Sequence, residues 1–160
     1  MITSHTKHMS MHQFKSEQYL PIDREKAWAF FSSPKNLSVI TPPEMEFKIL
    51  TALHGEEIYE GMKIDYTVKP LLGIKVRWQT EICRVDNKKY FTDRQTKGPY
   101  KTWEHTHTFE DTDKGLLMTD VVNYSLYFGF IGKLVERLVV RRKINSIFAY
   151  RKNILDKLFK

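Results

Sequence analysis

The chain has 160 residues, 41% of them hydrophobic and 13% aromatic, so one domain of this size can bury a core without disulfide or metal staples. Its single cysteine, Cys83, excludes an internal disulfide framework and indicates a reducing compartment, so we expect a cytoplasmic protein. The net charge of +7 is compatible with nucleic acid, an anionic membrane surface or an acidic ligand as partner. No apolar run reaches the roughly 20 residues of a membrane span.

The amino-terminal part predicts a tail, a strand and two short helices. Residues 1–11 are polar and carry histidines without acidic neighbours, so we expect a tail there. Alternation of side-chain character predicts a strand over 13–20. Asp23 is a suitable N-cap for a helix over 24–33, and a second short helix over 37–40 ends at two consecutive prolines.

The middle of the chain changes from helical spacing to strict alternation. Polar turns interrupt this alternation at short intervals, which predicts an antiparallel meander of about six strands. The predicted strands cover 46–53, 61–68, 74–82, 91–95, 103–109 and 116–126.

Helical spacing returns over 132–160 and predicts one long helix. At about 1.5 Å per residue it is long enough to cross the sheet and cover its apolar face. Leu138 lies in its apolar stripe, whereas Arg151 and the other basic residues are interpreted as its solvated outer face. The pattern therefore predicts an α+β fold with one domain over 12–160 and an apolar cavity between sheet and helix.

The strand faces predicted to point inward carry polar groups among aromatic ones. The inward polar residues are Asp93, Gln95, His105, His107 and Asp120. Buried carboxylates and imidazoles require partners, so two interpretations compete. These residues form either an internal hydrogen-bonded network or a polar patch that orients a ligand in the cavity.

Three motifs resemble those of a known family. They are Gly98-Pro99-Tyr100, the Trp-x-His-x-His-x-Phe pattern over 103–109, and Thr119-Asp120. With the opening over 21–37, they make the chain similar, over residues 12 to 159, to the START-like superfamily. This is the SRPBCC group, also called Bet v 1-like or polyketide cyclase/dehydrase-like.

The resemblance implies a helix-grip fold, in which a curved antiparallel sheet of six to seven strands wraps around a long C-terminal helix, with two short helices after the first strand. Members bind lipids, sterols, polyketides, hormones or other hydrophobic molecules, and some are enzymes. The resemblance therefore implies a class of function and names no ligand.

We expect the chain to bind a small hydrophobic molecule of the lipid or polyketide-like kind, with transport of that molecule as a further role. The residues expected to contact it are Trp28, Tyr66, Trp78, Phe91, Gln95, Trp103, His105, His107, Phe109, Asp120 and Leu138. The alternative is a small cyclase or dehydratase in which His105, His107 and Asp120 perform acid–base chemistry. Cys83 lies outside the inward set and is interpreted as a small buried side chain rather than a nucleophile.

A metal ion and a nucleic acid are the other partners that the sequence brings into question. His105 and His107 share a strand face and, with Asp93 or Asp120, could form a two-histidine, one-carboxylate site. Paired strand histidines are more often hydrogen-bonded core residues, so neither a metal nor another cofactor is predicted. Nucleic acid is not expected because no stacking platform accompanies the basic residues.

A glycine- and phenylalanine-containing segment over 128–132 is interpreted as an apolar entrance loop to the cavity. Together with the basic amphipathic helix that follows, it leaves transient membrane contact open. The expected oligomeric state is a monomer or a weak homodimer.

Overall fold

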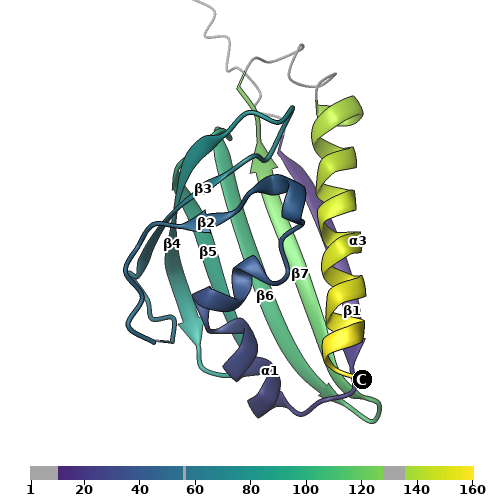
Figure 1. The fold of residues 1–160 in the computed structure, drawn as a ribbon. Helices are drawn as coiled ribbons and strands as arrows, with labels where there is room; N and C mark the ends of the chain where they lie inside the picture. The colour runs from purple at the N-terminus through teal and green to yellow at the C-terminus, as the bar shows by residue number, and fades with distance from the viewer. Residues whose placement is uncertain (1–10, 56, 128–135) are drawn as a thin grey trace, which may run out of the picture.

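A curved, fully antiparallel sheet forms the frame of the structure, which is a computed structural model that describes residues 11–55, 57–127 and 136–160. The sheet has seven strands in the order β1-β7-β6-β5-β4-β3-β2 (Figure 1). The strands are β1 His12–Leu20, β2 Lys48–Ile49, β3 Lys63–Val68, β4 Val76–Asp86, β5 Tyr90–Lys97, β6 Thr102–Thr112 and β7 Gly115–Ser125. The predicted meander is confirmed, and the first strand pairs with the last one.

The helix after β1 begins where the sequence predicts it. The side chain of Asp23 accepts a hydrogen bond from the backbone N–H of Lys26 at 2.7 Å and caps α1, Arg24–Phe31. The second short helix is a 3-10 turn, η1 Pro34–Ser38, and a further turn, η2 Pro43–Met45, follows it. These turns cross in front of the sheet and close one side of its concave face (Figure 1).

The strand predicted over 46–53 is reduced to the two residues of β2. Its ladder with β3 ends because the backbone N–H groups of Leu50 and Thr51 both donate to the carbonyl of Asp65, at 2.8 and 3.3 Å. The hydroxyl of Thr51 then accepts from the N–H of Asp65 at 2.8 Å, which replaces the next ladder bond. The alternation of side chains in the sequence gives no sign that a side-chain hydroxyl replaces a backbone carbonyl here.

The C-terminal helix runs along the end of the sheet formed by β1 and β7 (Figure 1). A π-helical turn, η3 Glu136–Val140, leads into α3, Arg141–Leu158. The ring of Phe148 packs 4.6 Å from that of Phe14 on β1, and the Gln18 amide donates to the carbonyl of Lys152 at 3.1 Å. The predicted helix-grip arrangement is thereby confirmed; the entrance loop over 128–132 lies outside the described residues.

Two expectations for this helix are wrong. Arg151 was assigned to the outer face but is only 6% exposed, because it continues the buried stripe of Ile144, Phe148 and Leu155. Leu138 was assigned to the cavity but is 47% exposed. Among the described residues, no helix is both long enough and apolar enough to cross a membrane.

Candidate functional site

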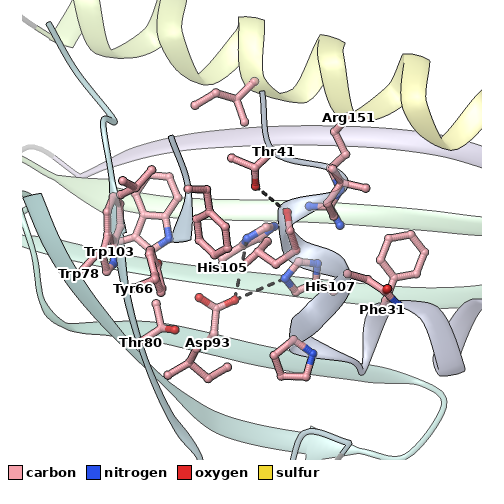
Figure 2. A pocket seen from close by; sticks show the side chains of 18 of the residues that line it. Phe31, Thr41, Tyr66, Trp78, Thr80, Asp93, Trp103, His105, His107 and Arg151 are labelled. Carbon is pink, nitrogen blue, oxygen red and sulfur yellow. Dashed lines mark hydrogen bonds and ion pairs between the residues drawn. The ribbon is translucent and has the colours of Figure 1, made fainter. Parts of the chain in front are cut away.

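A cavity of about 200 Å³ lies between the concave face of the sheet, α3 and the segment that contains η1 and η2. Tyr66, Trp78 and Trp103 line one side, and Phe31 lies on the other (Figure 2). Tyr66 stacks on Trp78 with ring centroids 6.0 Å apart, and Trp103 meets Trp78 edge-on at 5.5 Å. The lining is therefore largely apolar, and aromatic rings that pack on one another form part of it.

One wall of the cavity carries a cluster of ionisable side chains from three neighbouring strands. His105 and His107 leave the same face of β6, and their ring centroids are 3.8 Å apart. On one side of them, Oδ1 of Asp120 on β7 lies 2.9 Å from Nε2 of His105 and 2.8 Å from Nδ1 of His107. The first contact is an aligned hydrogen bond, whereas the second is close but not aligned as one.

Asp93 on β5 faces the other nitrogen of each imidazole. Its Oδ2 lies 3.4 Å from Nε2 of His107 and 3.9 Å from Nδ1 of His105 (Figure 2). Each imidazole thus lies between two carboxylates, one from each adjacent strand. This arrangement follows from strand register, because β5 places Asp93 opposite His105 and β7 places Asp120 opposite His107.

Arg151 extends from α3 toward this cluster (Figure 2). Its Nη1 lies 3.3 Å from Oδ1 of Asp120, and its guanidinium carbon lies 5.4 and 5.6 Å from the rings of Phe31 and Phe148. Its Nε is buried and has no hydrogen-bond partner within the part of the chain that the structure describes. Sequence reasoning missed this residue, although its spacing of three from Phe148 and seven from Ile144 was a usable signal.

Burial and charge act in opposite directions on the cluster. Burial raises the pKa of Asp120, but Arg151 and the two imidazoles outweigh it and hold the pKa of that carboxyl well below its usual range. Burial, aided by His107, lowers the pKa of His105. Burial also lowers the pKa of His107, but the contacts of this imidazole with Asp120 and Asp93 have the larger effect. The pKa of His107 is therefore raised.

No family model matches the chain, and no curated protein matches it. Solved structures do match. Ginseng major latex-like protein from Panax ginseng has a TM-score of 0.67 at 12% identity, with 93% of this chain and 97% of that one covered. A Thalictrum norcoclaurine synthase, in complex with a transition-state analogue, has a TM-score of 0.67 at 17% identity, covering 95% and 98%. A Mycobacterium smegmatis protein has 0.64 at 18%, covering 96% and 93%.

The chain has the START-like, or Bet v 1-like, helix-grip fold. At these identities the likeness establishes the fold alone. The helix-grip cavity contains six of the eleven residues expected to contact a ligand: Tyr66, Trp78, Phe91, Trp103, His105 and His107.

The other five expected residues lie elsewhere in the helix-grip fold. Trp28 and Phe109 pack on each other behind the lining, with ring centroids 5.7 Å apart. Asp120 lies behind the two histidines, and Leu138 is largely exposed. Gln95 holds the turn before β6, since its amide donates to the carbonyl of Tyr100 at 2.7 Å and accepts from the N–H of Tyr100 at 3.2 Å.

Part of the lining comes from the 34–47 segment, which sequence reasoning did not assign to the cavity. Leu37, Ile40, Met45 and Phe47 face the cavity from this segment. These residues lie in, between and directly after the two 3-10 turns, so their apolar positions follow neither a period of 3.6 nor one of 2. Only the tertiary fold shows which of them point inward.

Proposed function

We propose that this protein binds a small hydrophobic ligand in the helix-grip cavity. The observation that carries the proposal is a largely apolar cavity of about 200 Å³ that carries the polar cluster around His105 and His107 on one wall. An apolar pocket with a few convergent polar groups is the usual form of a small-molecule site. The bound transition-state analogue in the Thalictrum norcoclaurine synthase supports a ligand in the same fold.

The size of the cavity favours a compact ligand. An engineered protein cavity of about 150 Å³ accommodates benzene, and sites for drug-sized molecules usually exceed about 300 Å³. A cavity of about 200 Å³ therefore fits a molecule of one or two rings better than a long acyl chain. The polar wall favours a ring system that carries at least one oxygen or nitrogen.

Thermal unfolding and calorimetric titration with 2-naphthol and with palmitate test this proposal. We expect 2-naphthol to bind one to one and to raise the Tm, because a ligand that binds only the folded state stabilises it. Ile147→Trp places a larger side chain at the cavity wall, and Ile154→Trp makes the same change at a half-buried position outside it. Binding should fall in the first variant only; if a panel of one- and two-ring compounds leaves the Tm unchanged, the proposal is wrong.

A second candidate is an enzyme that moves protons on a bound carbonyl compound. The favouring observation is that His105 and His107 both line the cavity while each contacts two carboxylates, which is a suitable arrangement for general acid–base catalysis. Cyclase and dehydratase reactions need such proton transfer.

Deuterium exchange tests the enzymatic candidate with a small ketone. We expect the protein to accelerate exchange at the activated carbon of 2-tetralone in D2O, and His105→Ala and His107→Ala to abolish the acceleration while circular dichroism shows that the fold is retained. Exchange that is no faster with the protein than in buffer alone would leave binding as the function.

A further inference from the structure

We propose that Asp93, His105 and His107 bind a divalent transition-metal ion, with a coordination position open to the cavity. The three side chains offer one carboxylate oxygen and two imidazole nitrogens, and these ligand atoms all lie within 4.8 Å of one another. The proposal does not depend on whether the cavity also takes an organic ligand.

The distances between the ligand atoms suit such an ion. Zinc binds imidazole nitrogen at about 2.0–2.1 Å and carboxylate oxygen at about 2.0–2.2 Å, so two ligands of one ion lie no more than about 4.3 Å apart. Oδ2 of Asp93 is 3.4 Å from Nε2 of His107 and 3.9 Å from Nδ1 of His105. Both separations fall within this limit, and the ligand atoms of the two histidines lie within 4.8 Å of each other.

Hydrogen bonding alone does not join these three atoms. The 3.9 Å between His105 Nδ1 and Asp93 Oδ2 is longer than a hydrogen bond. A hydrogen bond between Nε2 of His107 and Asp93 therefore leaves His105 Nδ1 3.9 Å from the same carboxylate oxygen. An ion between them would contact all three ligand atoms at once.

Asp120 forms a second layer behind the ligands, and Arg151, which itself lines the cavity, pairs with it. Histidines that bind metals usually donate their other N–H to a carboxylate, which fixes the tautomer and orients the ring. Here the other nitrogens, Nε2 of His105 and Nδ1 of His107, both lie within 3 Å of the same oxygen of Asp120. Arg151 neutralises Asp120 from 3.3 Å, which leaves Asp93 as the carboxylate with charge to offer an ion.

The position of the two layers supports a site that is open on one side. Asp93, His105 and His107 line the cavity, whereas Asp120 does not. Three protein ligands with a free position are typical of catalytic zinc and of two-histidine, one-carboxylate iron(II) sites. Two imidazoles among three ligands disfavour Mg²⁺ and Ca²⁺, which prefer all-oxygen sites.

Zinc and cobalt titrations of the full chain, after treatment with EDTA, test this site. We expect one Zn²⁺ per chain whose affinity falls at least tenfold in Asp93→Asn, an isosteric change that removes the charge. Asp120→Asn should weaken binding 10- to 100-fold through loss of ring orientation. Asp111→Asn, at an exposed carboxylate outside the cluster, is the matched control and should bind as the wild type does.

The histidines near the amino terminus provide a background that is equal in all of these variants. At a hundredfold excess of free Zn²⁺ over the Kd we expect the Tm to rise by about 5–10 °C. Bound Co²⁺ should give visible absorption bands that Asp93→Asn removes. Equal zinc affinity in the wild type and in a folded Asp93→Asn variant would place the ion outside the cluster and overturn the proposal.

Nitrogen NMR of the histidine side chains in the unmodified protein keeps the proposal testable if Asp93→Asn does not fold. Zinc should shift Nδ1 of His105 and Nε2 of His107, the two nitrogens that face Asp93. If the resonances of His105 and His107 do not move when zinc is added, the proposal fails.

Discussion

The buried ion pair between Arg151 and Asp120 is the feature at residue scale on which the candidate site depends most. Both side chains are 8% exposed, and the same oxygen of Asp120 also contacts both imidazoles. A buried charge that loses its partner is costly, whereas the intact pair contributes little net stability. Removing Arg151 therefore affects the cluster more than the number of its hydrogen bonds suggests.

We expect Arg151→Met to lower the free energy of unfolding by about 3–5 kcal/mol in urea denaturation, because it leaves Asp120 buried without its cation. The neighbouring Lys152 has an exposed side chain, so Lys152→Met should change stability by no more than about 0.5 kcal/mol. The double variant Arg151→Met with Asp120→Asn should lose less than the sum of the two single changes. Additive losses would show that the two residues do not interact.

At the scale of elements, helix caps and turns determine where helices and strands begin. Asp23 begins α1, which carries Trp28 and Phe31 to the sheet, and Gly115 begins β7, which carries Asp120. Both positions rest on backbone geometry that the sequence shows directly: an N-cap acceptor in one case and a glycine in a turn in the other.

We expect Asp23→Ala to destabilise the protein by about 1 kcal/mol through loss of the acceptor for the Lys26 N–H. Asp23→Asn should be close to neutral because asparagine is an equally good N-cap. Thermal melts of the two variants give the comparison, and equal losses in both would mean that the charge, rather than the cap, stabilises α1.

Gly115→Ala should destabilise the protein more than Gly73→Ala does. Gly115 has φ of +110°, and a Cβ there would lie 2.4 Å from the carbonyl oxygen of Leu20 at the end of β1. Gly73 also has positive φ, at +68°, but a Cβ there meets open space. Both changes strain the backbone, and only the first also forces β7 from β1. Chemical denaturation of the two variants measures the difference; equal losses would exclude the clash.

At the scale of the whole molecule, the sheet has its shortest hydrogen-bonded ladder at the β2 end. Strands β6 and β7 pair with each other over their whole length, and β7 also pairs with β1 over residues 116–124, whereas β2 has two residues and one neighbour. The cavity lies between these regions, since its polar wall is on β5 and β6 and part of its lining is on the 34–47 segment.

Hydrogen exchange should therefore be slowest in β6 and β7 and fastest in β2 and the 3-10 turns, because few buried contacts and short ladders allow local opening. Mass spectrometry of exchanged peptides, with and without 2-naphthol, measures this. We expect the ligand to slow exchange in the 34–47 segment while β6 changes little. Uniform exchange along the chain would contradict a cavity closed by a less stable segment.

The alternating and helical patterns predicted most of the elements and most of the polar wall. Alternation placed Asp93, His105, His107 and Asp120 on inward strand faces, and the structure brings all four together. The same reasoning assigned Arg151 to solvent, because it weighed the charge of the side chain above its position in the helical stripe. It assigned Leu138 to the cavity because it extended that stripe into residues 136–140, which form a π-helical turn before α3. It placed Phe109 and Trp28 on the cavity because periodicity identifies a buried face without distinguishing its lining from its core.

The sequence by itself determined the order of the elements, the helix-grip resemblance and the set of ionisable groups that point inward, because periods of 2 and 3.6 and turn residues act locally. Only the tertiary structure decided which nitrogen faces which carboxylate, that both imidazoles share one oxygen of Asp120, and that a cation from α3 completes the cluster. These relations depend on strand register and on how the helix crosses the sheet, and both are set by contacts between residues far apart in the chain.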